Sequence, residues 1–178
     1  MRPIAILLSV MIAMTSAFQC NRTEKKDDCT IVLHPHESLP ENTDGMTTIF
    51  LAGTIDMGNS TDWQAETAEY FSNQPGRYLL FNPRQEHWDA NREGVMDYQV
   101  NWELEHLEKA DIIIMNFLAD SRSPITLLEM GLFARSGKLL VCCPKKFYRY
   151  DNVRITCKRY DIPLYEDFPA LLEAVGKQ

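Results

Sequence analysis

Glu129 is a carboxylate in an otherwise apolar helical segment. Ile125 lies four residues before it, and Leu132 and Phe133 follow three and four residues after it, so all three share its side of a helix. Burying a carboxylate among such side chains is costly unless it is paired or performs chemistry. The pattern leaves two interpretations open: a functional glutamate, or one bonded to nearby backbone or to a buried cation.

Glu103 is the second acidic candidate, because it borders an apolar stripe at helical spacing that is formed by Met96, Val100, Leu104 and Leu107. Taken alone it resembles one more solvated helix carboxylate. Its helix ends just before the next strand, however, so Glu103 can approach the same sheet edge as Glu129. Two carboxylates at one site suggest glycosyl transfer, in which one attacks the anomeric carbon and the other orients the sugar or handles protons.

The start of the helix that carries Glu129 has a signal of its own. Ser123 followed by Pro124 is typical of an N-cap and first-turn pair. The free backbone N–H groups of such a helix end form an anion site. A polar or anionic part of a ligand is therefore expected there.

The elements that must position these residues alternate along the chain. Strands are predicted at 47–53, 77–81, 111–117, 138–143 and 163–165, and helices at 62–72, 94–110 and 168–175, with another from the loop 118–124 to about Ser136. The segment 153–160 alternates like a strand, but a parallel sheet needs a crossover there, which favours a helix. Residues 30–46 are interpreted as an irregular lead-in.

This alternation predicts an α/β fold, a flavodoxin-like or Rossmann-like three-layer sandwich around a parallel sheet of about five strands. Ligands of such sheets bind beyond the carboxyl ends of the strands, where the strand order reverses. The loops after Gly53, Phe81 and Phe117 are therefore expected to form the site.

The chain has 178 residues, which is enough for one domain with a core. Its formal net charge of −7 argues against a nucleic-acid polymer as partner and favours a small polar ligand. Residues 1–29 are interpreted as a signal-like or disordered segment before a domain at 30–178. The apolar run from Ile4 to Phe18 favours export, with a lipid-anchored Cys20 or a cytoplasmic enzyme with a misplaced start codon as alternatives. Membrane association is expected only if this segment is retained.

The cysteines and histidines predict no metal site. The five cysteines lack zinc-site spacing, and Cys142-Cys143 lie in an apolar run typical of core packing. His34 and His36 are too few for a typical metal site. No metal or other cofactor is expected.

Three motifs, in their order and spacing, resemble the nucleoside 2-deoxyribosyltransferase-like family: Ile49-Phe50-Leu51-Ala52-Gly53, the helix end from Trp102-Glu103 to Ala110-Asp111, and Ser123-Pro124 with Leu128-Glu129-Met130-Gly131. The resemblance covers roughly residues 30–175. It implies that Glu129 attacks the sugar C1′ and releases the base, and that Glu103 orients the nucleophile or passes a proton to the base. It also implies that Gly53, with Thr54 to Asp56, closes over base and sugar.

The resemblance implies further binding residues. Ser123 lies six residues before Glu129. At the matching position, transferases of the family that act on free nucleosides often carry Asp, whereas the related 5′-monophosphate N-glycosidases carry Ser. The resemblance therefore implies that Ser123 favours tolerance of a phosphate. Pro124 weakens this, because it removes one backbone donor. Family members commonly form homo-oligomers with shared active sites, and Asn152 is the residue expected to enter a neighbour's site.

Three other side chains are candidates near the site. Trp63 and Trp88 are candidates for stacking on a base, although plain packing explains each equally well. Arg84 follows the second strand and suits either a phosphate or a surface carboxylate.

Three functions remain open for a nucleoside or nucleotide ligand. A deoxyribosyltransferase moves the sugar to a second base, whereas a hydrolase lets water take the sugar from a nucleoside or its 5′-monophosphate. The third is a non-catalytic nucleotide-binding module, since fold does not fix function. Asn59-Ser60-Thr61 is a glycosylation sequon on the expected active-site loop, which disfavours a eukaryotic secretory route for an enzyme.

Overall fold

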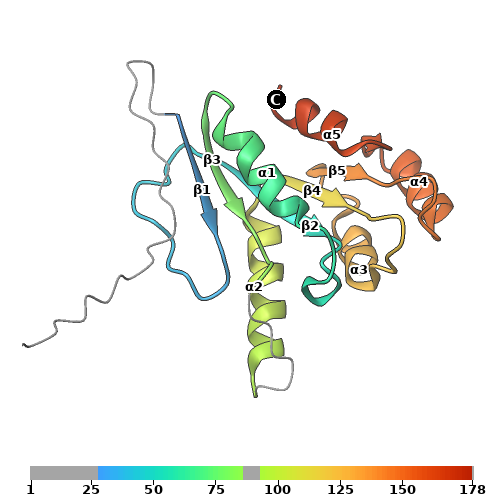
Figure 1. The fold of residues 1–178 in the computed structure, drawn as a ribbon, viewed down its shortest axis with the longest axis horizontal. Helices are drawn as coiled ribbons and strands as arrows, with labels where there is room; N and C mark the ends of the chain where they lie inside the picture. The colour runs from blue at the N-terminus through green and yellow to red at the C-terminus, as the bar shows by residue number, and fades with distance from the viewer. Residues whose placement is uncertain (1–27, 86–92, 178) are drawn as a thin grey trace, which may run out of the picture.

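The computed structural model describes residues 28–85 and 93–177 (Figure 1). The signal-like segment, Cys20 and Trp88 lie outside these residues. Within them, six parallel strands form one sheet: β1 (Cys29–Leu33), β2 (Thr47–Gly53), β3 (Arg77–Phe81), β4 (Ile112–Asn116), β5 (Leu139–Cys142) and β6 (Leu164–Tyr165). The helices are α1 (Trp63–Ser72), α2 (Val95–Lys109), α3 (Pro124–Phe133), α4 (Tyr150–Arg159) and α5 (Phe168–Val175), with a short 3-10 turn, η1 (Asp56–Gly58).

The strand order is β1-β3-β2-β4-β5-β6. From β3 to β6 this is the 2-1-3-4-5 order of flavodoxin-like sheets, which confirms the predicted fold class. The chain runs from β2 to β3 on one side and then returns to β4 on the other, so the order reverses at β2. Figure 1 shows β1 at one end of the sheet and α4 and α5 toward the other.

Helices cover both faces because the strand side chains alternate. In β2, Ile49 and Leu51 point to a core shared with Trp63 of α1 and Leu171 of α5. Phe50 and Ala52 point to the opposite core, which is completed by residues of three helices, among them Trp102 of α2, Met130 of α3 and Val153 of α4. Such two-sided burial explains the nearly continuous apolar strands that the sequence displays.

The first strand was missed by the sequence interpretation, which assigned residues 30–46 to an irregular lead-in. Thr30 to Leu33 instead pair in parallel with β3, as the outermost strand of the sheet. The prolines and Gly45 do belong to a connection without a helix, which links β1 to β2 past the intervening β3. The sheet therefore has six strands and not about five.

The apolar stripe of α2 faces the core only at its end, where Leu107 is fully buried. Met96 and Val100 are 51% and 43% exposed, whereas Gln99, Trp102 and His106 are buried. The helix is turned because the Trp102 ring packs near Phe50, and the His106 ring stacks on Trp102 and meets the edge of Phe81. Among the described residues, no helix is long and apolar enough to cross a membrane.

Candidate active site

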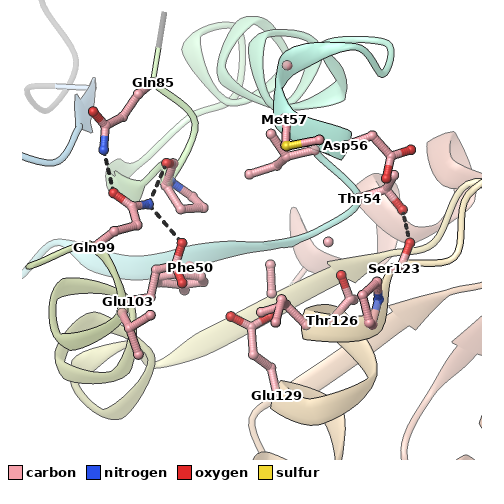
Figure 2. Close-up of a pocket in the computed structure, with 18 of the residues that line it drawn as sticks. Phe50, Thr54, Asp56, Met57, Gln85, Gln99, Glu103, Ser123, Thr126 and Glu129 are labelled. Atoms are coloured by element: carbon pink, nitrogen blue, oxygen red, sulfur yellow. Dashed lines mark hydrogen bonds between the residues drawn. The ribbon is translucent and has the colours of Figure 1, made fainter. Parts of the chain in front are cut away.

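A cavity of about 500 Å³ lies where the strand order reverses, beyond the ends of β2 and β4 (Figure 2). The three loops expected from the sequence contribute to its wall, through Thr54 to Gly58, Pro83 with Gln85, and Ser123. Helices α2 and α3 supply the rest. Its charged side chains among the described residues are Asp56, Glu103 and Glu129.

Glu129 lies in the second turn of α3 and is 8% exposed. Within residues 28–85 and 93–177, no hydrogen bond or ion pair holds its carboxylate. Burial, together with the negative charge of Glu103, raises the pKa of Glu129 to about 8. Neither structural explanation left open by the sequence, a backbone partner or a buried cation, is found among these residues.

Glu103 projects from α2 into the same cavity. Figure 2 shows its carboxylate and that of Glu129 facing one space between α2 and α3. Burial raises the pKa of Glu103, while the hydrogen bond that Gln99 Nε2 donates to its Oε1, at 2.8 Å, opposes the rise. The two glutamates, named here the acidic pair, can therefore retain a proton near neutral pH.

Gln99 and Gln85 were not singled out from the sequence. Gln99 is 8% exposed and also donates to the Pro83 carbonyl at 2.9 Å, and Gln85 donates to Gln99 Oε1. Gln99 thus fixes one side of Glu103 and ties α2 to the loop after β3. The signal was available, because Gln99 lies one helical turn before Glu103.

Opposite the acidic pair, hydroxyl groups form a continuous set of hydrogen bonds, named here the hydroxyl chain. Thr54 Oγ1 lies 2.6 Å from Ser123 Oγ, which lies 3.0 Å from Ser121 Oγ. Ser121 Oγ in turn donates to Asp56 Oδ1 at 2.8 Å. Thr54, Ser121 and Ser123 are buried, and Ser121 was missed by the sequence interpretation.

The sequence predicted that the Ser123 side chain caps the N-terminus of α3, but in the structure it does not. Its backbone is left-handed, with φ of 42°, and its side chain makes no cap hydrogen bond because it is committed to Thr54 and Ser121. Pro124 does begin α3 as expected. The first-turn N–H groups, including those of Ile125 and Thr126, consequently remain uncapped at the cavity wall.

Gly53 has a steric reason to be glycine. Its φ is +151°, and a Cβ atom there would lie 2.4 Å from the Asn116 carbonyl and 2.8 Å from the Trp63 ring. Only glycine allows β2 to approach β4 this closely at the cavity floor. Asp56 and Met57, further along the same loop, also have positive φ.

Trp63 does not fit the stacking role considered for it. Its indole is 2% exposed in the core of the opposite sheet face, meets the edge of Phe168, and donates from Nε1 to the Thr54 carbonyl at 2.8 Å. The ring therefore supports the loop after β2 from behind and is absent from the cavity wall.

Asn152 and Arg84 also lie off the cavity wall. Asn152 is exposed on α4 and does not line the cavity of its own chain. Arg84 donates to the carbonyls of Gly58 and Ser60, and its Nε lies 3.6 Å from Asp62 Oδ2. The sequence left a phosphate and a surface carboxylate open as partners of Arg84, and the structure shows the carboxylate of Asp62. The Arg84 guanidinium also holds the loop after β2.

The structure brings Gly53, Thr54, Asp56, Glu103, Ser123 and Glu129 together around one cavity. Across the two described ranges, no group of three or more histidine, cysteine, aspartate or glutamate side chains is arranged to hold a metal ion. The polar side chains that line the cavity are carboxylates, amides and hydroxyls.

Comparisons with known proteins identify the family of the chain and a structure of similar fold. The family model described as nucleoside 2-deoxyribosyltransferase like matches residues 46–147, more than half of the chain. A crystal structure of a conserved protein from Enterococcus faecalis V583 is similar, with a TM-score of 0.55 and 13% identity over 72% of this chain and 96% of that one; at this identity it shows the fold alone. No curated protein matches the sequence. The chain belongs to the nucleoside 2-deoxyribosyltransferase-like family.

Proposed function

We propose that this protein breaks the N-glycosidic bond of a (deoxy)nucleoside and transfers the sugar through a covalent ester on Glu129, as a nucleoside 2-deoxyribosyltransferase. The observation that carries the proposal is a buried carboxylate, without a hydrogen bond to any described residue, that faces a second carboxylate in the cavity. Buried structural carboxylates are normally paired. A perturbed carboxylate left unpaired in a cleft is typical of a reacting group.

In the first step, a carboxylate oxygen of Glu129 attacks C1′ and forms an ester while the C1′–N bond breaks. The bonding pair goes to the base nitrogen, and the base leaves with a proton supplied by Glu103. In the empty cavity the raised pKa of Glu129 keeps the proton of the pair on that residue, so the reacting form requires this proton to move to Glu103, which leaves Glu129 ionised. The raised pKa values of the acidic pair favour a shared proton, and environments of this kind serve acid and nucleophile roles in glycosyl transfer.

In the second step, a nitrogen of another base attacks C1′ and the ester bond breaks. Glu129 recovers its carboxylate, and the proton released by the incoming base returns to Glu103. Water in place of the second base gives hydrolysis by the same route. Transfer and hydrolysis therefore share the ester and differ only in the acceptor.

The polarity of the cavity wall supports one orientation of the substrate. On the side of Glu103, the amides of Gln85 and Gln99 and the apolar Met96 and Val100 suit a heterocyclic base. The sugar then lies over Glu129, with its far end toward the hydroxyl chain. Gly53, Thr54, Asp56 and Ser123 serve as substrate-binding residues in this orientation.

We also propose a homo-oligomer in which Asn152 enters a neighbouring site. Exposed apolar side chains lie on α2 and α3, namely Met96, Val100, Ile125, Leu128 and Leu132, and the first three of these line the cavity. Ile125, Leu128 and Leu132 follow helical spacing and form one stripe, which a second copy would cover. Asn152 is exposed, so it is free to reach another chain.

Incubation of the full chain with 2′-deoxynucleosides, with and without an acceptor base, tests the proposed function by chromatography. We expect a new nucleoside when the acceptor is present and none with Glu129→Ala. Free sugar in both conditions, lost equally in Glu129→Ala, would establish hydrolysis instead. Shifts in melting temperature without release of base from any substrate would favour the non-catalytic binding module, and base release by Glu129→Ala at the wild-type rate would refute the mechanism.

A further inference from the structure

The side-chain amide of Gln99 can have only one orientation. Its Nε2 atom lies 2.9 Å from the carbonyl oxygen of Pro83, and a carbonyl oxygen accepts hydrogen bonds but cannot donate them. If the amide nitrogen and oxygen of Gln99 were exchanged, two acceptors would face each other. Gln99 is also 8% exposed, so the amide has little room to turn away. The nitrogen therefore faces Pro83.

Both amide protons of Gln99 are consequently in use. One is donated to Pro83, and the other is donated to Glu103 Oε1 at 2.8 Å. The amide oxygen of Gln99 accepts a hydrogen bond from Gln85, and Figure 2 shows the Gln99 side chain between Gln85 and Glu103. Gln99 thus has no donor left for a ligand, although it lines the cavity. Its contribution to the site is made through Glu103.

The hydrogen bond from Gln99 makes the two oxygens of Glu103 different. Among residues 28–85 and 93–177, it is the one hydrogen bond that the Glu103 side chain forms, and it ends on Oε1. A carboxyl group accepts best at the oxygen that carries no proton, so a proton on Glu103 is directed to Oε2. Oε2 is then the atom of Glu103 that exchanges a proton with other groups in the cavity.

The hydrogen bond also stabilises the ionised form of Glu103. The charged side chains that share the cavity wall with it in the described ranges are Glu129 from α3 and Asp56 from the loop after β2, and the loop after β3 contributes the uncharged Gln85. No described cation lines the cavity, so the amide of Gln99 takes the place of one. It opposes the rise in the pKa of Glu103 that burial causes, whereas Glu129 has no such donor.

We propose that Gln99 is a positioning residue for the proton of the acidic pair, because its amide holds Glu103 ionised in the empty cavity and leaves Oε2 as the atom that takes up the proton and delivers it to the leaving base. The proposal rests on the proposed function for the fate of this proton. The proton passes from Glu129 to Glu103 Oε2, and then to the base nitrogen as the C1′–N bond breaks. Gln99 keeps both of its own protons throughout.

A titration of the free protein tests the hold of Gln99 on Glu103 without any substrate. NMR of isotope-labelled glutamate carboxyl carbons follows both members of the acidic pair, with Glu103→Gln and Glu129→Gln used for assignment. Gln99→Met keeps the length of the side chain and removes the donor. We expect it to raise the midpoint of the Glu103 titration by about 1 pH unit, as for loss of a hydrogen bond to a charged group that water partly replaces, and to move the Glu129 midpoint less.

Asn101→Ala is the matched control for this titration. Asn101 is an exposed amide on the same helix and does not line the cavity. Both midpoints should therefore keep their wild-type values. An unchanged Glu103 midpoint in folded Gln99→Met would overturn the proposal.

A double-mutant cycle tests whether Gln99 acts on the reaction through Glu103. Single-turnover base release from a 2′-deoxynucleoside is compared in the wild type, Gln99→Met, Glu103→Gln and the double variant. We expect Gln99→Met to lose roughly 10-fold alone and less than about 2-fold in the Glu103→Gln background, because the two residues act as one unit. Equal losses in both backgrounds would show that Gln99 contacts the substrate or only supports the fold, and would overturn the proposal.

Two further outcomes remain decisive. If Gln99→Met does not fold, the glutamine side-chain amide signals of the wild type replace it. One signal that follows the Glu103 titration and loses this dependence in Glu103→Gln supports the proposal, and the absence of such a signal overturns it. If even the wild type releases no base, the proposed function is wrong, and the titration alone then decides whether Gln99 holds Glu103 ionised.

Discussion

The two ends of the cavity differ in how completely their polar groups are bonded. At one end, Thr54, Ser121 and Ser123 have all their protons committed to one another and to Asp56. At the other end, Glu129 is buried without a hydrogen bond to a described residue, and Glu103 has Gln99 on one oxygen. The same fold satisfies one polar cluster and leaves the other unsatisfied within one site.

This difference indicates that the bonded end of the cavity positions the substrate and that the unsatisfied end carries out the reaction. A bonded network holds a fixed geometry, which suits recognition of a substrate group. An unsatisfied carboxylate is costly in the folded protein and is free to bond with a substrate. Changes at the acidic pair are therefore expected to affect rate and stability in opposite directions, and changes at the hydroxyl chain to affect both in the same direction.

The largest expected effect is on the acidic pair. Glu103→Gln removes the proposed proton donor while it retains size, and we expect base release to fall roughly 10²- to 10³-fold. Glu105→Gln, an exposed neighbour on the same helix, is the control and should retain the wild-type rate. Single-turnover base release measures both. A loss smaller than about 10-fold in Glu103→Gln would remove Glu103 from the chemistry.

Glu129→Gln is expected to stabilise the protein. The pKa of Glu129 is 4.5 in the unfolded chain and about 8 in the folded protein. Between these two pH values the unfolded chain has Glu129 ionised while the folded protein keeps it protonated, so the free energy of unfolding of the wild type falls as pH rises. Glutamine does not titrate and avoids this loss. We expect a gain in the free energy of unfolding below about 1 kcal/mol at pH 5 and about 3 kcal/mol at pH 7, measured by urea denaturation. A gain that does not change with pH would contradict the raised pKa.

Ser121→Ala is expected to weaken the bonded end more modestly. It interrupts the hydroxyl chain between Ser123 and Asp56, so we expect a loss of stability of about 1–2 kcal/mol and of roughly 10-fold in kcat/KM for the nucleoside. Ser38→Ala, at an exposed position away from the cavity wall, is the control. Unchanged stability and turnover in Ser121→Ala would show that the chain is not needed for either.

The smallest expected signal comes from mixed oligomers. If Asn152 completes a neighbouring site, Glu129→Ala and Asn152→Ala chains are each inactive alone, but a hybrid dimer of the two has one intact site. In an equal mixture of chains that exchange freely, half of the dimers are hybrids, so we expect roughly a quarter of the wild-type activity. Activity after unfolding and refolding the mixture, compared with each variant alone, measures this. No recovery, with an oligomer confirmed by light scattering, would exclude a shared site.

The sequence predicted the layers of this fold well, because buried parallel strands and amphipathic helices have strong local signals. The helix at 168–175 and the strands at 47–53 and 77–81 have the predicted bounds. The first strand was missed because the prolines and Gly45 that follow it dominated the interpretation, although Thr30-Ile31-Val32 is β-branched throughout. An edge strand joined without a helix leaves no alternation to detect.

The site was predictable where it depends on position in the fold, and not where it depends on side-chain packing. The loops after β2, β3 and β4 meet as strand order requires, which brings Glu103 and Glu129 to one cavity. The inward turn of Trp63 and the commitment of Ser123 to Thr54 depend on tertiary contacts that no local pattern encodes. The exposure of Met96 and Val100 at the start of the α2 stripe could not be foreseen for the same reason, since the packing of Trp102 and His106 decides the rotation of the helix.

The ester on Glu129 is the central claim, and direct trapping tests it best. A 2′-deoxy-2′-fluoroarabinonucleoside has an electron-withdrawing fluorine that slows both steps through the cation-like transition state, which allows the ester to accumulate if it forms. After incubation and acid quench, mass spectrometry should show the whole protein heavier by one fluorosugar, with the label on the peptide that contains Glu129. Base release without any adduct, or an adduct on Glu103, would contradict the assignment of Glu129 as the nucleophile.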